Sequence, residues 1–438
     1  MAKDTFTDSL WYSLTPVGPA LPKLQGDVEA DVAIVGAGFL GMTTALVLRE
    51  RGVNVALIEA MEPGFGASGR NTGFVVPALK KALSPAQVEK RFGAKRGATF
   101  NTMIGRSGEI LFDRLRRYGI DGQAEQNGWM QPAHNRGALA GCKAMAAEWQ
   151  DRGFDVRLLD RGETEALIGL SGYHGALYIP TGGQLNPLAY ARSLAAKVKE
   201  MGAQFFSHSP VQEVRAENNK WRVLTPSGSV VARKVVFCTN AMAGKLLPSV
   251  VASFIPAGSW QIATQPLSRE AQERILPSRI PIADTRRHLF AARWSPDGRI
   301  VGGGLCYPGP YRAWRARRRF ARRFQEFLPE LGPLKAEFAW TGKVSMTLDA
   351  MPRLYELGPN LFAPLSCNGR GVALTAAFGT ELASFIADET PADDFVVPLT
   401  RPDRIPARTF AGLAPYLWLP YSDFMDMRET EKLGPEAA

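Results

Sequence analysis

Three glycines and a glutamate near the N-terminus have the residue types and the spacing that bind a dinucleotide. Gly36, Gly38 and Gly41 follow the G-x-G-x-x-G pattern directly after an apolar run, and a second apolar run ends at Glu59. The glycines allow a tight turn, a close approach of backbone to a pyrophosphate and close packing of helix on strand, and the acid accepts hydrogen bonds from ribose hydroxyls. The helix expected at 42–50 would turn its N-terminal amides toward the phosphates. We therefore predict a strand, a helix and a strand around a dinucleotide.

The segment that follows Glu59 favours FAD over NAD. Residues 64–74 are rich in small and polar side chains, and an NAD enzyme has no general need for such a run. FAD lies extended, so its pyrophosphate and ribityl chain need donors along their length. A glycine-rich surface loop is the alternative. The expected donors, and the glycines that let backbone come close, are Ser68, Arg70, Asn71, Thr72, Gly66, Gly69 and Gly73.

Two later segments support the same interpretation. Residues 230–243 resemble a β-branched strand that ends in a small polar turn, and residues 366–375 (SCNGRGVALT) precede a helix-like stretch that continues to about Ile386. Gly369 and Gly371 open that helix, so its free amides could face an anion. A reduced flavin carries negative charge at N1 and C2=O, and a helix N-terminus is a suitable partner for it.

As an ordered series, the motifs resemble the superfamily of FAD-dependent D-amino-acid oxidases and glycine oxidases, and most closely its gamma-glutamylputrescine oxidoreductase-like branch. The resemblance covers about residues 8–390. It includes LWYSL (10–14), DVAIVGAGFLG (31–41), GASGRNTG (66–73), GGQLNPLAYARSLAAKVKEMGAQ (182–204), VVFCTNAMA (235–243), WTGKVSMTLDAMP (340–352) and NGRGVALT (368–375). The motifs and the resemblance together assign to FAD the residues Gly36, Gly38, Phe39, Leu40, Gly41, Glu59, Ala60, Gly66, Ala67, Ser68, Arg70, Asn71, Thr72, Gly73, Val211, Thr239, Asn240, Gly369, Arg370, Gly371, Val372 and Ala373.

The order of expected elements predicts an α/β fold, α+β overall, in two discontinuous domains. A Rossmann-like FAD-binding domain is joined to a second domain on a mainly antiparallel sheet that caps the flavin. The ligand then lies at the carboxyl ends of the strands, between the domains. The expected segments are a lead-in at 1–30, an FAD-binding domain at 31–120, 181–240 and 336–390, a substrate (capping) domain at 121–180 and 241–335, and a C-terminal tail at 391–438.

Composition is that of an ordinary soluble protein. The chain has 438 residues, enough for two domains, and is 45% hydrophobic, with no apolar stretch of the length that spans a bilayer. The N-terminus lacks the apolar core of a signal peptide. Four histidines and no Cys/His cluster predict no metal site. Four cysteines without framework spacing predict free thiols and a cytoplasmic location; they are Cys142, Cys238, Cys306 and Cys367.

Much of the net charge of +10 lies in residues 311–331, which hold seven arginines. Phe320, Phe324 and Phe327 recur at helical spacing, so an amphipathic helix with a basic outer face is expected. It is either a solvated helix or a contact for anionic lipid or an acidic partner. The aromatic stretch 415–427 either packs on its own domain or contacts a membrane or a subunit. A peripheral position at the inner face of a membrane thus stays open, whereas no nucleic-acid motif is present.

The resemblance implies oxidation of a carbon–nitrogen bond in an amine or amino-acid-like substrate, with CH–NH or CH–NH2 as the donor. A hydride passes to flavin N5, and the imine that forms then hydrolyses. The cofactor carries the electronic work, so no general base is assigned. The absence of a Ser-His-Asp or paired-carboxylate signature agrees with this. The histidines are therefore expected to be structural; they are His134, His174, His208 and His288.

The family's substrate clamp is missing. Amino-acid oxidases of the superfamily have an arginine that holds the α-carboxylate in a bidentate way, and Val344 stands at the aligned position. The flavin-linked cysteine of some relatives would fall near Gly342, which implies noncovalent FAD. An amine with a distant acidic or amide group therefore fits better than an α-amino acid.

Arg370 replaces a histidine that is common in the family's G-H-G segment. It either holds an anionic end of the substrate or pairs with a structural carboxylate. Phe74, Trp340 and Cys367 are expected walls of the substrate cavity, with a place in the core as the alternative for Trp340.

Three functions stay open. The first is an amine oxidase that uses oxygen, and the second is an amine dehydrogenase that passes electrons to a carrier or quinone and docks through the basic helix and the aromatic tail. The third is a non-catalytic flavin-binding protein that recruits acidic partners through residues 311–331.

Overall fold

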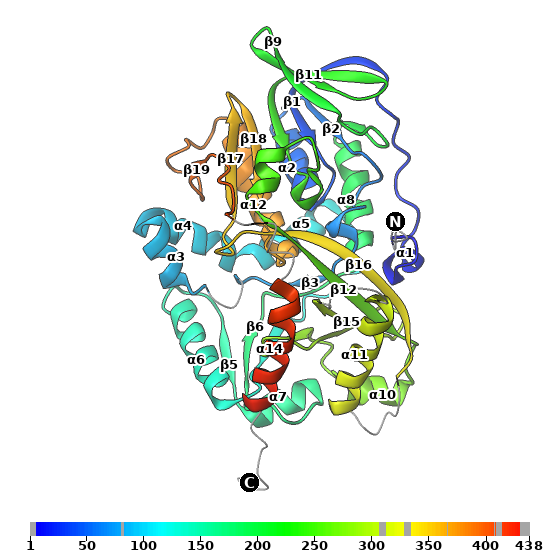
Figure 1. Cartoon of the computed structure of the whole chain (residues 1–438), viewed down its shortest axis with the longest axis vertical. Helices are drawn as coiled ribbons and strands as arrows, with labels where there is room; N and C mark the ends of the chain where they lie inside the picture. The colour runs from blue at the N-terminus through cyan, green and yellow to red at the C-terminus, as the bar shows by residue number, and fades with distance from the viewer. Residues whose placement is uncertain are drawn as a thin grey trace.

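The computed structural model describes residues 6–79, 83–305, 312–327, 334–365, 367–406, 408 and 414–429. Cys306, the end of the expected 311–331 helix and Ser366 lie outside the described residues. Figure 1 shows two large sheets, the first in the upper half of the molecule and the second in the lower half. The expected α/β fold with one mainly parallel and one mainly antiparallel sheet is confirmed.

The central strands of the first sheet run parallel, and helices or loops cover both faces of the sheet, as is usual for parallel strands. The order is β19-β17-β18-β11-β1-β2-β8, with the β9–β10 hairpin attached to β11, and β1 runs parallel to β2 and to β11. One face is covered by helices α2 (Phe39–Glu50), α8 (Pro187–Glu200) and α12 (Gly371–Ile386), and the other by the hairpin and residues 243–254. The strands are β1 (Gly26–Val35), β2 (Val55–Ile58), β8 (Gln204–Phe206), β9 (Glu213–Glu217), β10 (Lys220–Leu224), β11 (Gly228–Phe237), β17 (Arg353–Gly358), β18 (Leu361–Leu365) and β19 (Leu399–Thr400).

The second sheet has the order β16-β12-β15-β14-β13-β4-β6-β5, and only the β13–β4 pair is parallel among the pairs of its described strands. On β12, Ile262 packs against helix α11 (Arg312–Phe327) on one face of the sheet. Its neighbour Ala263 lies on the other face, in a cluster with Trp11 and Trp340. The strands are β4 (Trp129–Pro132), β5 (Arg157–Leu159), β6 (Ala176–Ile179), β12 (Ile255–Thr264), β13 (Ile282–Ala283), β14 (Ala291–Trp294), β15 (Ile300–Leu305) and β16 (Ala336–Met346).

The remaining elements connect or cover these sheets. Strand β3 (Phe74–Val75) pairs with β7 (Gly183–Gln184) in a small sheet between them. The helices are α1 (Leu10–Leu14), α2 (Phe39–Glu50), α3 (Pro85–Phe92), α4 (Ala94–Gly105), α5 (Ser107–Tyr118), α6 (Arg136–Gln150), α7 (Arg161–Ile168), α8 (Pro187–Glu200), α9 (Pro248–Ala252), α10 (Arg269–Arg274), α11 (Arg312–Phe327), α12 (Gly371–Ile386) and α14 (Ala414–Glu429), with 3-10 turns η1 (Ala67–Gly69) and η2 (Asn240–Met242).

Three strands belong to other sheets than the segments expected from the sequence suggest. Strand β16 belongs to the second sheet although its residues were expected in the FAD-binding domain, because it pairs with β12 from Ala336 to Met346. Strand β1 begins at Gly26, inside the expected lead-in, and β19 lies inside the expected tail. Sequence motifs mark ligand contacts rather than strand pairing, so they do not locate such boundaries. The domain limits themselves stay a prediction.

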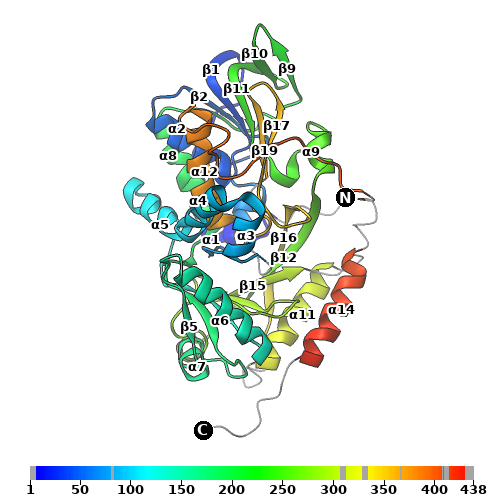
Figure 2. The same cartoon turned by 90° about the vertical axis from the view of Figure 1, so that its left-hand side faces the viewer.

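Helices α11 and α14 lie side by side at the outer surface of the second sheet (Figures 1 and 2). The amphipathic helix expected from the sequence is present, with Phe320 and Phe324 buried against the sheet. An ion pair between Arg319 and Asp423 joins the two helices. Across the described parts of the chain, every helix is too short or too polar to cross a membrane.

Candidate active site

The carboxyl edge of the first sheet presents the N-terminus of α2. Gly36 has a φ of +105°, and a Cβ there would lie 2.9 Å from the carbonyl oxygen of Cys238. A Cβ at Gly41 would lie 2.1 Å from the carbonyl oxygen of Gly36. Only glycine permits this tight turn. Gly38 caps the helix without a side chain, and the N–H of Phe39 donates to Oγ of Ser68 at 3.0 Å. The next N–H groups of the first turn are directed at the space above the sheet.

Glu59 follows β2 at the same edge. One carboxylate oxygen accepts the N–H of Ala37 at 2.7 Å, and the other accepts the N–H of Met61 at 2.9 Å. Burial raises the pKa of this carboxyl, and the two backbone donors partly offset that effect. Each oxygen keeps a lone pair for a further donor, such as a ligand hydroxyl.

The polar side chains of the segment 66–73 are mostly used inside the protein. The Arg70 guanidinium donates to the carbonyl of Phe65 at 2.7 Å and lies over the ring of Phe65. The Asn71 amide donates to the carbonyl of Ser68 at 2.8 Å and accepts the N–H of Gly73. These protein contacts use donors that both side chains were expected to offer to the cofactor. A role of Arg70 and Asn71 toward FAD stays a prediction.

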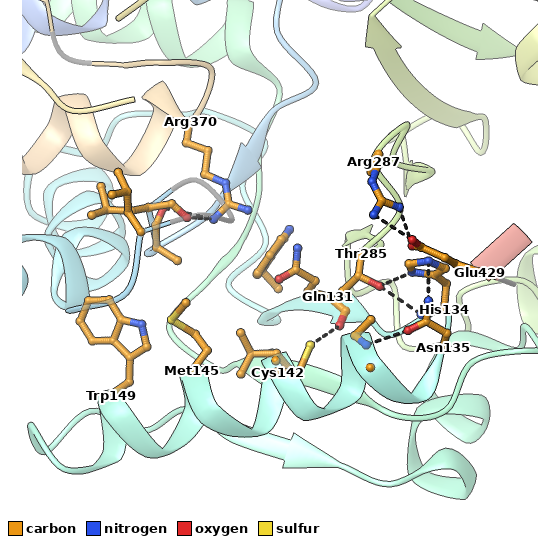
Figure 3. A pocket seen from close by; sticks show the side chains of 18 of the residues that line it. Gln131, His134, Asn135, Cys142, Met145, Trp149, Thr285, Arg287, Arg370 and Glu429 are labelled. Atoms are coloured by element: carbon orange, nitrogen blue, oxygen red, sulfur yellow. Dashed lines mark hydrogen bonds and ion pairs between the residues drawn. The ribbon is translucent and has the colours of Figure 1, made fainter. Parts of the chain in front are cut away.

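A cavity of about 770 Å³ lies between α6, strands β4 and β6, the N-terminus of α12 and the last turn of α14. In Figure 3, Trp149 and Met145 rise from α6 on one side, and Arg287 and Glu429 lie on the other. Its lining includes Ala78, Leu79, Leu83, Trp129, Gln131, His134, Asn135, Cys142, Met145, Trp149, Leu177, Thr285, Arg287, Arg370, Arg428 and Glu429.

Arg370 caps α12 and lines this cavity. Its Nη1 donates to the carbonyls of Ala78 and Leu79, and its guanidinium lies 5.2 Å from the ring centre of Trp129. Within the described residues, Arg370 forms no ion pair with a carboxylate, and Nε and Nη2 have no protein acceptor. Burial lowers the pKa of Arg370 to about 10, so the guanidinium is charged at neutral pH.

Polar residues line the opposite side of the cavity. His134 contacts the hydroxyl of Thr285 through Nδ1 at 2.7 Å and the amide of Asn135 through Nε2 at 3.1 Å. Both ring nitrogens are thus engaged in protein contacts. Arg287 donates to the carboxylate of Glu429 at 2.9 Å, which ties the end of α14 to the second sheet.

The comparison with protein families decides which cofactor this edge serves. A family model described as "FAD dependent oxidoreductase" matches residues 31–385, most of the chain. The chain belongs to the FAD-dependent oxidoreductase family. FAD is accordingly the cofactor of this oxidoreductase.

Individual relatives agree with the family. The FAD-dependent oxidoreductase is 29% identical over 374 residues to gamma-glutamylputrescine oxidoreductase of Escherichia coli (strain K12), covering 85% of this chain and 87% of that one. Its fold matches the crystal structure of L-proline dehydrogenase from P. horikoshii with a TM-score of 0.70 at 21% identity, over 84% and 94% of the two chains. Glycine oxidase from Geobacillus kaustophilus matches with a TM-score of 0.68 at 19% identity, over 83% and 96%.

The carboxyl edge of the oxidoreductase fits FAD. A Cβ added at Gly66 or Gly369 would meet no atom within 4 Å, so both positions border open space, and α12 begins without a side-chain cap. Val211 lies in the loop after β8, close to Glu59, whose carbonyl accepts the N–H of Ser209. The fold thus brings the expected FAD residues to one edge, and their contacts with FAD stay a prediction.

Asn240, which was expected to bind FAD, also forms hydrogen bonds within the protein. Its Oδ1 accepts the N–H of Ser345 on β16 at 3.0 Å and the N–H of Ala241 at 2.8 Å. The side chain therefore joins the first sheet to the second. Thr239 lies beside it, directly before η2.

Two expected cavity walls lie elsewhere in the oxidoreductase. Trp340 is fully buried, and its indole donates to the carbonyl of Arg70 at 2.9 Å. It packs edge to face on Trp11, so the core alternative describes it better. Phe74 lies on β3 and packs against the main core, and neither residue lines the 770 Å³ cavity. Of the four expected pocket residues, Arg370 is in its lining, and Cys367 is absent from it like Phe74 and Trp340.

Several cavity residues were not anticipated from the sequence. Trp129, Met145 and Trp149 form its apolar part, and Arg428 and Glu429 come from the C-terminal helix. The sequence of α6 predicts only a helix and does not indicate that its side chains line a cavity. The sequence of α14 likewise contains no motif that indicates a binding site. Trp11 lies in the LWYSL motif that the resemblance marks, but the motif does not reveal its contact.

Proposed function

We propose that this flavoenzyme oxidises the carbon–nitrogen bond of an amine whose other end carries an anionic group, and that Arg370 holds that group. The observation that carries the proposal is a half-buried guanidinium in the wall of a 770 Å³ cavity, with backbone carbonyls as its acceptors and no described carboxylate beside it. Burying a charge without a counter-charge is unfavourable. A substrate carboxylate at Nε and Nη2 of Arg370 would supply the missing counter-charge.

The charge of the cavity lining favours an anionic ligand as well. Its described charged residues are the three arginines Arg287, Arg370 and Arg428 and the single acid Glu429, so arginines outnumber acids. Glu429 is paired with Arg287, so it does not neutralise Arg370. A lining of one sign attracts ligands of the other sign into a cleft of low dielectric. A volume of this size suits a molecule larger than glycine.

The chain itself provides orientation and exclusion of water. The rings of Trp129 and Trp149 and the side chain of Met145 make one part of the cavity apolar, which favours the neutral form of an amine. Fixing the anionic end on Arg370 limits the positions that the amine can occupy. When bound, FAD supplies the hydride acceptor. His134 is not assigned as a base because both of its ring nitrogens contact protein groups.

The names of the relatives support this substrate class. Gamma-glutamylputrescine, glycine and L-proline, the compounds named for them, are amines that also contain a carboxylate. The identities of 29% or less leave the individual substrate open. Val344 in place of the family's arginine clamp, which the sequence indicates, favours a carboxylate that lies away from the reacting carbon.

A screen of amines under anaerobic conditions tests the proposal. The purified protein with FAD is mixed with amines that do or do not carry a carboxylate, and the loss of the flavin absorption band is followed. We expect bleaching by amines with a carboxylate several bonds from the nitrogen. Stoichiometric peroxide on admission of oxygen would identify an oxidase. A flavin band that no amine bleaches would contradict the proposal and favour a non-catalytic flavin protein.

A second candidate, an amine dehydrogenase at a cytoplasmic membrane surface, is favoured by the outer face of α14. Leu417 and Met427 are 76% and 71% exposed, and Trp418, Tyr421 and Phe424 are exposed beside them. The neighbouring helix α11 adds the exposed side chains of Arg315, Arg317, Arg318 and Arg322. Aromatic and aliphatic side chains beside arginines match the interface of an anionic bilayer, so we take such a bilayer as the occupant of this face.

Vesicle flotation tests this second candidate. The holoenzyme is mixed with phosphatidylcholine vesicles that do or do not contain phosphatidylglycerol. Binding to the anionic vesicles alone, weakened by salt and by Phe424→Ser, supports it. An absence of binding contradicts it, and so does a dimer that Phe424→Ser disrupts, because the face would then hold a second copy. Binding to an acidic peptide in place of vesicles would assign the face to an acidic partner.

A further inference from the structure

Four successive backbone carbonyls in the segment 70–73 accept hydrogen bonds from side chains that are distant in the sequence. The indole of Trp340 donates to the first at 2.9 Å, and the indole of Trp11 donates to the second at 2.8 Å. Nη1 of Arg293 donates to the third and the fourth at 3.2 and 3.3 Å. We call these three side chains the carbonyl clamp.

The carbonyl clamp is built from three separate parts of the fold. Trp11 comes from α1, Arg293 from β14 and Trp340 from β16, and all three side chains are at most 1% exposed. The two indoles pack edge to face with centres 5.9 Å apart, and the guanidinium of Arg293 lies 5.2 Å from the ring centre of Trp11. Each donor is therefore held in place by another donor, which makes the clamp a rigid unit.

The N–H groups of residues 71 and 72, unlike the carbonyls of the same segment, form no hydrogen bonds with the described residues. Asn71 accepts the N–H of Gly73 through its own side chain. The N–H groups of Asn71 and Thr72 have no acceptor among the described residues. A buried or half-buried backbone donor normally finds a partner. These two donors are thus available to a ligand at the edge where FAD is expected.

We propose that the carbonyl clamp is a positioning device for FAD, which fixes the segment 70–73 before the cofactor arrives so that the N–H groups of Asn71 and Thr72 bind it. The proposal rests on the FAD site at the carboxyl edge of the first sheet, but not on the identity of the amine. A segment that is already ordered loses less conformational freedom on binding, and the affinity rises accordingly. The clamp also makes FAD binding depend on the contact between the second sheet and the N-terminal helix.

Phenylalanine substitutions test the proposal, because they keep an aromatic ring and remove the indole donor. Apoprotein of Trp11→Phe and Trp340→Phe is titrated with FAD and followed by flavin fluorescence. Loss of one donor is expected to raise the Kd for FAD by about five- to twentyfold. Trp294→Phe is the matched control, since this equally buried indole donates at 2.9 Å to Ile275, outside the segment. It should lower stability to a similar degree and change the Kd by less than about twofold.

Hydrogen exchange on the wild-type protein decides the question even where a variant does not fold. The amides of Asn71 and Thr72 are expected to exchange rapidly in apoprotein and to be protected once FAD is bound. An absence of that protection overturns the proposal, and so does an equal loss of FAD affinity in Trp294→Phe and Trp11→Phe. A protein that binds FAD with the predicted protection but oxidises no amine would contradict the proposed function and leave the clamp standing.

Discussion

The guanidinium of Arg293 and the backbone of Gly73 lie so close together that a side chain cannot stand between them. A Cβ at Gly73 would lie 2.4 Å from Nη1 of Arg293 and 2.0 Å from the carbonyl oxygen of Leu185. Gly73 also has a φ of +79°. The second sheet therefore meets the expected FAD segment at a position that admits only glycine.

Gly73→Ala is expected to destabilise the protein and to weaken FAD binding. The added methyl must displace Arg293 or Leu185, which costs about 2–4 kcal/mol on top of the unfavourable φ. Thermal unfolding and FAD titration measure the two effects. Gly93→Ala is the control, because Gly93 has a φ of +83° and open space around the added Cβ. Equal losses in the two variants would mean that backbone strain alone acts, without the contact to Arg293.

Glu59→Gln should raise the Kd for FAD by about five- to thirtyfold, the equivalent of about 1–2 kcal/mol, because an amide keeps one acceptor and loses the charge that strengthens hydrogen bonds. Titration of the apoprotein with FAD measures it. Glu29→Gln on the exposed part of β1 is the control. An unchanged Kd in Glu59→Gln would remove Glu59 from the FAD site.

The raised pKa of Glu59 also predicts how the affinity for FAD changes with pH. Burial raises the pKa of Glu59 above its ordinary value of 4.5. FAD affinity of the wild type should therefore fall as the pH is lowered through the raised pKa, while that of Glu59→Gln stays level. The contribution of Glu59 to apoprotein stability has the opposite trend, since it is present below the ordinary pKa and is lost as the pH rises through the raised one. Parallel FAD titrations from neutral to acidic pH check this.

Asp426 fixes the C-terminal helix to the second sheet. Its buried carboxylate accepts the N–H groups of Arg287 and His288, both at 2.9 Å. Asp426→Asn leaves one of them without an acceptor, so the attachment of α14 should weaken by about 1–3 kcal/mol. Faster hydrogen exchange in residues 414–429 and a higher KM, with unchanged FAD affinity, are expected because Glu429 lines the cavity. An unaltered KM would show that the attachment of α14 does not contribute to substrate binding.

The first sheet and its cofactor edge could be predicted from the sequence because the constraint is local. Gly36, Gly41 and Glu59 each follow directly from a strand end or a helix start, and their spacing is typical of a dinucleotide-binding unit. The helix 312–327 was equally visible, since its phenylalanines recur at helical spacing.

The contacts between distant segments could not be predicted. Trp11, Arg293 and Trp340 meet at residues 70–73 only after both sheets have formed, and no spacing in the sequence records that meeting. The sequence left Trp340 as either a cavity wall or a core residue, and the burial of its side chain favours the core alternative. For Arg370 the sequence left two alternatives, and the structural ion pair is not observed among the described residues.

The most direct test of the central claim compares one amine that carries a distant carboxylate with its neutral amide, in the wild type and in flavin-replete Arg370→Ala and Arg370→Lys. The rate of anaerobic flavin reduction is measured against substrate concentration. For the carboxylate substrate, the second-order rate constant of flavin reduction should fall about ten- to a thousandfold in Arg370→Ala and recover only in part in Arg370→Lys, since a point charge does not replace a planar guanidinium. The neutral amide should react equally slowly with all three proteins. Wild-type kinetics with the carboxylate substrate in Arg370→Ala would contradict the account.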